Sequence, residues 1–217
     1  MSTPAAFFDM DRTLIRVNTG TEWVKWMRKR GEMTRLKMLQ ALAWLAQYKL
    51  SILDMEAVFE KGIAEMAGEL EQPMIDKAME FNKIFVFPQV APKGLQALEY
   101  HRKQGHVVAI LSSSTPYVTE PLARHLGIEH VLCTRLPVRD GKFVGIHTRP
   151  ACYGLGKVHW AEMFAREQQI DLARSFFYTD SYSDLPMLER VGIKRVINPD
   201  TRLARHARRL GWEVDQW

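Results

Sequence analysis

Two aspartates near the start of the chain carry the clearest chemical signal in the sequence. Asp9 and Asp11 follow the apolar run Ala5–Phe8, and Thr13 comes two residues later. Residues two apart in an extended strand point to the same side, so both carboxylates are expected to face one cleft. Two carboxylates that close repel each other unless a cation or a shared proton relieves them. The spacing therefore indicates a reactive or cation-binding site at the end of a buried strand.

Three further polar clusters follow apolar runs or begin helical stretches. They are Ser112 and Ser113 after the run 107–111, Lys157 at the start of a helical stretch, and Asp180 and Asp184 after the run 176–179. Each cluster alone has an ordinary explanation as a helix cap, a turn or a surface lysine. Together they fit the carboxyl edge of one parallel sheet, where doubly wound folds bind ligands. Serine hydroxyls and free N–H groups at a helix start also suit a phosphate.

These motifs resemble those of a known superfamily. In order and spacing they resemble the four motifs of the haloacid dehalogenase superfamily. The matching residues are Asp9-Met10-Asp11-Arg12-Thr13, Ser112, Lys157, and Asp180 with Asp184. The resemblance is closest to the phosphoserine-phosphatase-like branch, subfamily IB. It covers residues 5–17 and 88–212 well and residues 18–87 poorly. It implies a phosphatase, that is, a phosphoric monoester hydrolase.

The chain alternates apolar strands with helical stretches, which predicts a parallel sheet with right-handed crossovers and an α/β fold. The predicted strands are 5–10, 106–111, 130–136, 174–179 and 193–197, and the predicted helices are 93–104, 116–127, 157–169, 184–191 and 201–210. Asp140-Gly141 lies between two short apolar runs and predicts a hairpin turn. The resemblance implies a Rossmann-like three-layer core over residues 1–17 and 88–217. It also implies an inserted all-helical cap of the C1 type over residues 18–87.

One stretch of the predicted cap is unusually apolar. Residues 36–50 read LKMLQALAWLAQYKL, with few polar positions. A helix that is apolar nearly all round must be buried or face lipid, and this one is too short to span a bilayer. We favour a core helix of the cap. The alternatives are a hydrophobic wall of the substrate pocket, a dimer face, and docking to a membrane surface with the help of flanking basic residues.

The resemblance implies a role for each motif residue. Asp9 is the expected nucleophile that forms an aspartyl-phosphate, and Asp11 is the expected general acid and then base. Mg²⁺ is the implied cofactor, because it prefers few carboxylates together with water and phosphate oxygens. The remaining roles are phosphate binding by Ser112, Ser113 and Lys157, Mg²⁺ ligation by Asp9, the carbonyl of Asp11 and Asp180, and support by Thr13 and Asp184.

One departure from the family pattern concerns the substrate. The resemblance implies that phosphoserine-hydrolysing members carry a glutamate nine residues after the nucleophile, where it contacts the substrate amine. This chain has Asn18 there, and Glu22 is the nearest acid. Asn18 and Glu22 are therefore the cap positions expected to bear on specificity. We expect a small phosphorylated metabolite other than phosphoserine, with a leaving group that is wholly or partly apolar. The alternative is a lysophospholipid or another apolar phosphate at a membrane surface.

The same motifs also bear on whether the protein catalyses another class of reaction. The resemblance implies that dehalogenating relatives do not need the second aspartate, so Asp11 favours phosphoryl transfer over carbon–halogen cleavage. The core motifs do not exclude a phosphomutase. A non-catalytic module that binds phosphorylated ligands is the alternative of another class, and it is disfavoured because every charged motif position is retained.

Composition sets the remaining bounds. The 217 residues include 30 Lys and Arg against 25 Asp and Glu, a net charge of +5. This modest excess fits a solvated face, and no nucleic-acid partner is expected. Cys133 and Cys152 support no disulfide framework and indicate the cytoplasm. We expect a monomer or homodimer without a transmembrane segment or signal peptide. The seven histidines are expected in surface or capping roles, and His159 alone is also a candidate neighbour of the site.

Overall fold

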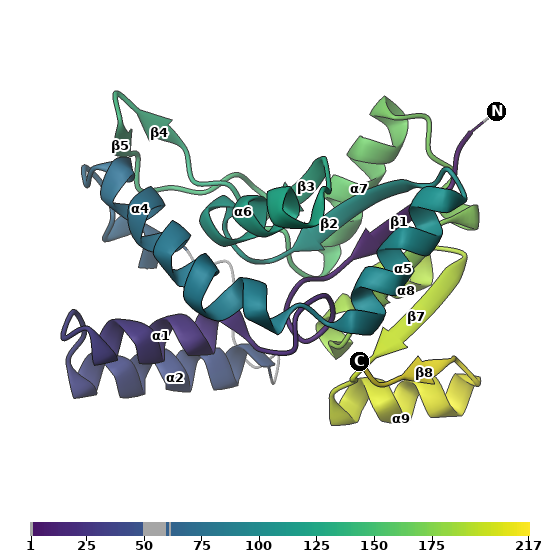
Figure 1. Ribbon diagram of the computed structural model, residues 1–217, viewed down its shortest axis with the longest axis horizontal. Helices are drawn as coiled ribbons and strands as arrows, with labels where there is room; N and C mark the ends of the chain where they lie inside the picture. Colours follow the sequence, from purple (N-terminus) through teal and green to yellow (C-terminus); the bar gives the residue numbers. More distant parts are fainter. Residues whose placement is uncertain (1, 50–59, 61) are drawn as a thin grey trace.

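A six-stranded parallel sheet forms the centre of the molecule (Figure 1). The computed structural model describes residues 2–49, 60 and 62–217, with the backbone alone for 44–49. The strands lie in the order β3-β2-β1-β6-β7-β8, each parallel to its neighbours. Their bounds are β1 Ala5–Phe8, β2 Val107–Ser112, β3 His130–Cys133, β6 Phe176–Thr179, β7 Ile193–Ile197 and β8 Val214–Asp215.

The helices of the core cover both faces of this sheet (Figure 1). One face carries α5 Pro92–Lys103 and α6 Pro116–Leu126, and the other carries α7 Leu155–Glu167, α8 Leu185–Arg190 and α9 Thr201–Leu210. Strand β1 shows why two cores are needed: Ala6 and Phe8 belong to the first, and Ala5 and Phe7 to the second. Alternate residues of a strand face opposite sides, so a strand that is apolar throughout is buried on both. The predicted three-layer α/β fold is confirmed.

The strand order places a switch point at the carboxyl edge of β1. From β1 the sheet grows through β2 and β3 on one side and through β6, β7 and β8 on the other. The helices that follow the two directions lie on opposite faces. In open α/β sheets, ligands bind in the crevice beside such a point. The residues that end β2 or directly follow β1 and β6 are therefore in the position that the sequence predicted for a site.

The chain between β1 and α5 folds mainly into helices that lie outside the sheet (Figure 1). The described ones are α1 Thr19–Lys29, α2 Arg35–Lys49, α4 Glu71–Phe81, the π-helix η1 Asn82–Val86 and the 3₁₀-helix η2 Phe87–Gln89. The rings of Trp23, Trp26, Phe81 and Phe85 pack against one another. These aromatic residues thus hold α1 to the end of α4. The bounds of a separate cap domain at residues 18 and 87 stay a prediction.

A β-hairpin joins the helical segment to the core. Strands β4 Val138–Arg139 and β5 Lys142–Phe143 are antiparallel, as the sequence predicted. The turn residues Asp140-Gly141 have φ angles of 50° and 71°, the left-handed conformations of a type I′ turn. Three backbone hydrogen bonds of 2.9 Å link residues 68–71 to residues 141–143. The helical segment is therefore attached to the core in two ways: by the chain at its two ends, and by these hydrogen bonds to the hairpin.

Helix α2 differs from the expectation of a buried helix. None of its described side chains, residues 35–43, is buried, and Leu36 and Leu39 are 77% and 60% exposed. The helix packs beside α1. The prediction of a core helix is wrong for these residues, and the rest of the apolar stretch lies outside the described side chains. None of the described helices combines the length and apolar character needed to cross a membrane.

The prediction of surface or capping histidines is wrong for His147, which is also buried, and most clearly for His101. This side chain is fully buried, with Nε2 2.9 Å from the hydroxyl of Tyr178 and Nδ1 2.8 Å from Nδ1 of His106. Burial, helped by the charges of His106 and Arg195, lowers the pKa of His101 to about 4. The imidazole is therefore neutral at neutral pH and serves as a core group between α5 and β6. Its partner Tyr178 is 77 positions away in the chain, so spacing could not reveal the contact.

Most predicted elements begin and end within three residues of the observed ones. The largest shift is at β3, which ends at Cys133 where the sequence predicted residue 136. The short strand β8 and the π-helix η1 were not predicted. Two residues pair in β8, which is too few for an alternation of apolar and polar residues to show.

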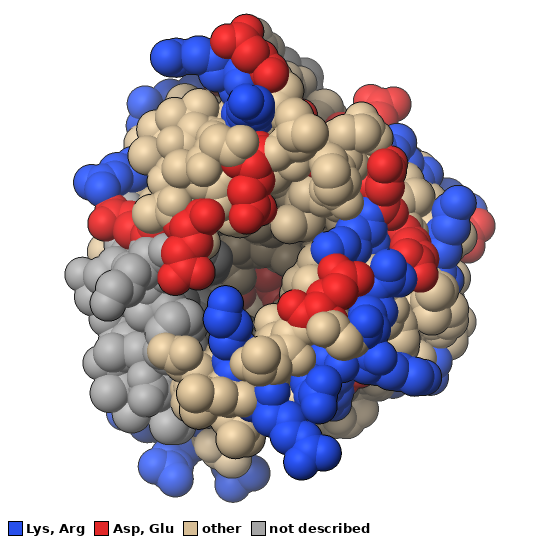
Figure 2. All heavy atoms as spheres, turned by 90° about the vertical axis from the view of Figure 1, so that its left-hand side faces the viewer, with Lys and Arg blue, Asp and Glu red and all other residues tan. Residues whose placement is uncertain are grey.

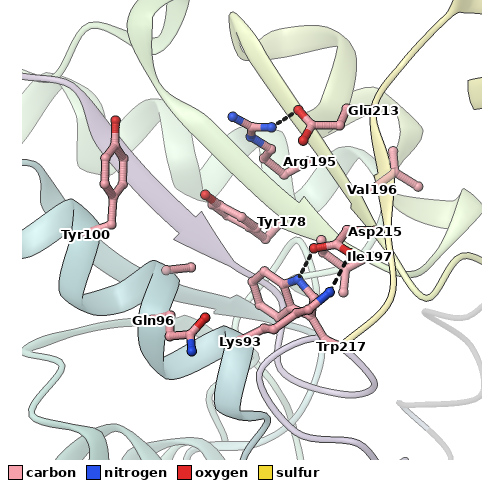
Figure 3. A pocket seen from close by; sticks show the side chains of 11 residues that line it. Lys93, Gln96, Tyr100, Tyr178, Arg195, Val196, Ile197, Glu213, Asp215 and Trp217 are labelled. Atoms are coloured by element: carbon pink, nitrogen blue, oxygen red, sulfur yellow. Dashed lines mark hydrogen bonds and ion pairs between the residues drawn. The ribbon is translucent and has the colours of Figure 1, made fainter.

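A cavity of about 390 Å³ lies between α5 and strands β6 to β8 (Figure 3). Trp217 extends along it, and its indole N–H donates to Asp215, which also pairs with Lys93 at 2.8 Å. Arg195 and Glu213 form a second ion pair on the opposite wall. None of the residues predicted for the site lines this cavity. It is therefore separate from the candidate active site.

Candidate active site

Six of the predicted site residues are buried: Asp9, Thr13, Ser112, Lys157, Asp180 and Asp184. Asp9 directly follows β1, and its N–H donates to the carbonyl of the neighbouring strand β6 at 2.9 Å. Ser112 is the last residue of β2, and Asp180 is the first after β6. The parallel register of the three strands brings their ends together. The sheet therefore positions these groups through backbone hydrogen bonds.

Lys157 links two of the buried acids. Its Nζ lies 2.7 Å from Oδ1 of Asp9 and 2.7 Å from Oδ2 of Asp184. The hydroxyl of Thr179 also donates to Oδ2 of Asp184, at 2.6 Å. The three charged side chains are 9% exposed or less. The structure thus brings the predicted nucleophile, the predicted phosphate-binding lysine and the predicted supporting acid into direct contact.

Glycine allows Lys157 to reach this position from α7. A Cβ at Gly156 would lie 1.8 Å from the carbonyl oxygen of Ala151, so no other residue fits the close approach of the helix start to the preceding loop. Gly154, just before the helix, has a φ of 51°. The sequence Gly154-Leu155-Gly156-Lys157 therefore lets the first turn of α7 pack against residue 151, which brings the lysine side chain to the buried acids.

Burial dominates the electrostatics of this site. It raises the pKa of Asp9 to about 7; Lys157 opposes the rise, and Asp184 and Asp11 add to it. For Lys157 burial alone lowers the pKa, but Asp184 and Asp9 outweigh it and hold the pKa above its ordinary value. The ammonium group is therefore charged at neutral pH. A second cation beside Asp9 would favour the ionised form of its carboxylate.

Asp11 makes a different set of contacts from Asp9. Oδ1 accepts the backbone N–H of Thr19 at 3.0 Å, and Oδ2 accepts Nδ2 of Asn18 at 3.1 Å and the hydroxyl of Thr19 at 3.2 Å. These donors lie at the start of α1. The two predicted acids thus have separate partners, Asp9 on the core lysine and Asp11 on the first residues of the helical segment.

The predicted phosphate-binding serines lie between β2 and α6. The hydroxyl of Ser112 is buried and accepts the N–H of Ser114 at 3.2 Å. Ser113 is half-buried. Helix α6 begins at Pro116 directly after this loop, so the serines lie at a helix N-terminus. This geometry suits an anion, and phosphate binding by Ser112 and Ser113 stays a prediction.

The supporting and specificity positions are less directly placed. The Thr13 hydroxyl is buried without a hydrogen-bond partner among the described residues, although its backbone N–H bonds to Met10 at 3.3 Å. Glu22 pairs with Lys25 at 2.7 Å in the first turn of α1. Asn18 bonds to Asp11 and to Thr21. The substrate-specificity roles predicted for Asn18 and Glu22 stay predictions.

Sequence reasoning missed three side chains that hold this site. Thr19 binds Asp11 and Thr179 binds Asp184, as described above. Asp200 accepts the N–H of Tyr182 at 2.7 Å while it caps α9, and so fixes the loop that carries the two later aspartates. Thr19 and Thr179 each border a predicted motif or strand. Their position beside a motif or strand was the only hint in the sequence. A threonine there is not part of a recognisable motif, so its contact with an aspartate could not be predicted.

The residues present fit a magnesium ion. Among the described residues, the buried Asp, Glu, Lys and Arg side chains are Asp9, Asp180, Asp184 and Lys157 alone. Three acids with one lysine leave negative charge that a divalent cation can offset. No three His, Cys, Asp or Glu side chains in the described ranges are grouped so as to hold a metal by themselves. The predicted set of two carboxylates and one carbonyl accords with Mg²⁺, which keeps several waters.

The face that carries α1, α4 and the hairpin is hollowed near its centre (Figure 2). Acidic atoms are visible inside the hollow, and both acidic and basic side chains border it. The acidic interior calls for a cation at its bottom.

Comparison with known proteins identifies the family. A family model of haloacid dehalogenase-like hydrolases matches residues 6–189, which include every predicted motif. The chain belongs to this family. A phosphoserine phosphatase of Mycobacterium tuberculosis is 31% identical over 98% of this chain and 70% of its own length. The superfamily and the phosphoserine-phosphatase-like branch predicted from the motifs are therefore confirmed, and so is the assignment to its phosphatases.

Two further proteins resemble the chain over nearly its whole length. A histidinol-phosphatase of Neisseria meningitidis is 25% identical, covering 96% of both chains. A solved phosphoserine phosphatase, with an analogue of its phospho-aspartyl intermediate, superposes with a TM-score of 0.71 at 18% identity, covering 100% of this chain and 94% of its own. The structural likeness shows the common fold, and the two sequence relatives carry different substrate names.

We expect Lys157→Met to lower the free energy of unfolding by about 3–5 kcal/mol, because the variant leaves Asp9 and Asp184 buried without their cation. Denaturant unfolding at neutral pH measures the change. The matched control is Lys93→Met, which removes an exposed pair with Asp215 and is expected to cost about 0–1 kcal/mol. Equal losses in the two variants would contradict the view that Lys157 stabilises the buried acids.

Proposed function

We propose that the protein is a Mg²⁺-dependent phosphatase that hydrolyses a monoester of a small phosphorylated metabolite through an aspartyl-phosphate. The observation that carries this proposal is the gathering of all buried charges of the described residues at one sheet edge, with Lys157 2.7 Å from Asp9. A carboxylate can attack a phosphate dianion only where a cation offsets the repulsion between them, and a buried ammonium does so strongly.

In the first half of the reaction, the carboxylate of Asp9 attacks the phosphorus atom. The bond between phosphorus and the ester oxygen breaks, and the departing oxygen takes a proton from Asp11. Ser112 and the N–H groups that follow it hold the phosphoryl oxygens, and Lys157 balances the charge that builds up between these oxygens and Asp9. The products of this half are the free alcohol and an acyl-phosphate on Asp9.

In the second half, Asp11 acts as a base. It removes a proton from a water molecule, whose oxygen attacks phosphorus while the bond to Asp9 breaks. Inorganic phosphate leaves and both aspartates return to their starting forms. Asp9, the carbonyl of Asp11 and Asp180 would hold Mg²⁺, which supplies positive charge next to the transferring phosphoryl group.

The name of the histidinol-phosphatase suggests a first substrate to test. Phosphoserine and histidinol phosphate are both phosphate esters of amino alcohols, but only phosphoserine also carries a carboxylate, and histidinol has an imidazole ring. Asn18 offers no negative charge to the ammonium group that both compounds carry, so it favours neither of them over a phosphate ester without an amine. The described tryptophans Trp23 and Trp26 pack into the helical segment itself, so they lend no support to an apolar pocket. The preference for a wholly or partly apolar leaving group therefore rests on Asn18.

An apolar phosphate at a membrane surface, such as a lysophospholipid, is the second candidate substrate. The observation that favours it is the exposure of Leu36 and Leu39 on α2 beside the basic residues Arg35 and Lys37. Exposed leucines next to lysine and arginine suit an anionic lipid surface. A non-catalytic binding module is the alternative of another class, and it would bind phosphorylated ligands without turning over 4-nitrophenyl phosphate.

Asp9→Asn is expected to reduce turnover of 4-nitrophenyl phosphate by several orders of magnitude, because the covalent route is lost. Steady-state kinetics and circular dichroism test activity and folding together. Asp76→Asn, on an exposed part of α4, is the matched control and should keep wild-type activity. A rate above about a tenth of wild type in Asp9→Asn, without deamidation back to aspartate, would exclude Asp9 as the nucleophile.

Activity is expected to stop when EDTA removes the metal and to return when Mg²⁺ is added. In Asp180→Ala the Mg²⁺ concentration for half-maximal activity should rise about tenfold or more, since a ligand is lost. Titration of Mg²⁺ into metal-free enzyme measures both effects, and Asp76→Ala is the control. Full activity in metal-free buffer, or an unchanged Mg²⁺ requirement in Asp180→Ala, is incompatible with the proposed cofactor site.

A substrate panel tests the proposed specificity. It contains phosphoserine, histidinol phosphate, alkyl phosphates of increasing chain length, and lysophosphatidate with and without anionic vesicles. We expect phosphoserine to have a kcat/KM more than about tenfold below the best compound, because its ammonium lacks a charged partner. If phosphoserine is the best substrate, the argument from Asn18 is wrong. A rate that increases with chain length and with vesicles supports the lipid candidate, and a rate independent of both excludes it.

A further inference from the structure

The contacts of Asp11 connect the reaction to the start of the helical segment. Asn18 and Thr19 donate hydrogen bonds to both carboxylate oxygens of Asp11, two to Oδ2 and one to Oδ1. These two residues are the N-cap and the first residue of α1. Both carboxylate oxygens are therefore engaged, which restricts rotation of the side chain about its last bond.

Asn18 divides its two amide atoms between two tasks. Its Oδ1 accepts the N–H and the hydroxyl of Thr21, at 3.0 and 2.8 Å, and so caps α1. Its Nδ2 donates to Asp11 at 3.1 Å. Serine can perform the first task, but its side chain ends one bond before the position of the amide nitrogen and carries no second polar atom to perform the second. The two tasks can therefore be separated by one substitution.

Thr19 contributes from the helix end itself. Its backbone N–H is one of the free donors at the start of α1, where the helix dipole also favours an anion. Its side chain is buried and adds the hydroxyl donor. The direction of the Asp11 carboxylate is thus set by the position of α1 relative to the core.

We propose that Asn18 and Thr19 are positioning residues for Asp11, which orient it toward the leaving-group oxygen. This proposal rests on the proposed function, in which Asp11 protonates that oxygen. It gives position 18 a role through Asp11, where the comparison with phosphoserine-hydrolysing relatives suggested a contact with the substrate. The start of α1 then controls proton transfer to the leaving group and leaves attack by Asp9 unchanged.

The basicity of the leaving group provides the readout. A phenolate is more basic than a 4-nitrophenolate, so phenyl phosphate depends more on a well-placed general acid than 4-nitrophenyl phosphate does. The two compounds share the same ring and fill a pocket similarly. The value of kcat/KM reports steps up to the first bond cleavage, which separates the acid role of Asp11 from its later role as a base.

The experiment compares Asn18→Ser and Thr19→Val with wild type on a series of substituted phenyl phosphates. We expect kcat/KM to fall about tenfold for phenyl phosphate and no more than about twofold for 4-nitrophenyl phosphate, because misplaced catalytic groups lose rate steeply. Thr19→Ser keeps the hydroxyl and should restore the wild-type ratio. Thr21→Val removes a contact to Asn18 that does not reach Asp11, and it should leave the ratio unchanged. Thermal unfolding verifies that each variant is folded.

The outcomes separate this proposal from the proposed function. If wild type hydrolyses neither compound, the phosphatase itself is refuted. If wild type is active and the variants lose both compounds equally or neither, the positioning role is refuted while the phosphatase remains. If Asn18→Ser instead changes KM only for phosphates that carry an amine, Asn18 is a substrate contact and the proposal is wrong.

Discussion

The ion pairs of Lys157 with Asp9 and Asp184 are the interactions on which the rest of the site depends. Three aspartates cannot be buried at one sheet edge unless a cation compensates them, and Lys157 is the compensating group that the described residues supply. Its 2.7 Å contacts to Asp9 and Asp184 join the end of β1 to the loop after β6. The close packing at Gly156 that brings α7 inward and the bond from Thr179 to Asp184 are best understood as supports for this ion cluster.

The second acid of the motif is placed by a different principle. Asp11 lies only two residues from Asp9, but its carboxylate accepts hydrogen bonds from Asn18 and Thr19 at the start of α1. A carboxylate at a helix N-terminus is stabilised by free N–H groups and the dipole, without a second buried cation. Two neighbouring acids are thereby given unlike surroundings. Unlike surroundings are what a pair of acids needs if one is to attack and the other to exchange protons.

The sequence alone could predict the core of this arrangement because each motif residue directly ends a strand or begins a helix. Once β1, β2 and β6 are parallel neighbours, the ends of the strands must meet. The bonds of Asn18 and Thr19 could not be predicted, because they depend on where α1 starts in space. The exposure of Leu36 depends likewise on what packs beside α2, and the burial of His101 depends on Tyr178, a distant residue. Apolar composition indicates that a surface is to be covered, but not by what.

The attachments of the helical segment explain how it can influence chemistry at the sheet edge. Residues 68–71 are bonded to the hairpin, and Tyr117 of α6 donates to Glu71 of α4 at 2.8 Å. The later half of the segment is thus held by the core on the side of the phosphate loop. The start of α1, by contrast, meets the core through the carboxylate of Asp11. Both oxygens of that carboxylate accept hydrogen bonds from the start of α1. Any shift of α1 must therefore either move Asp11 or break these hydrogen bonds. The position of α1 and the orientation of the Asp11 carboxylate are therefore coupled in this fold.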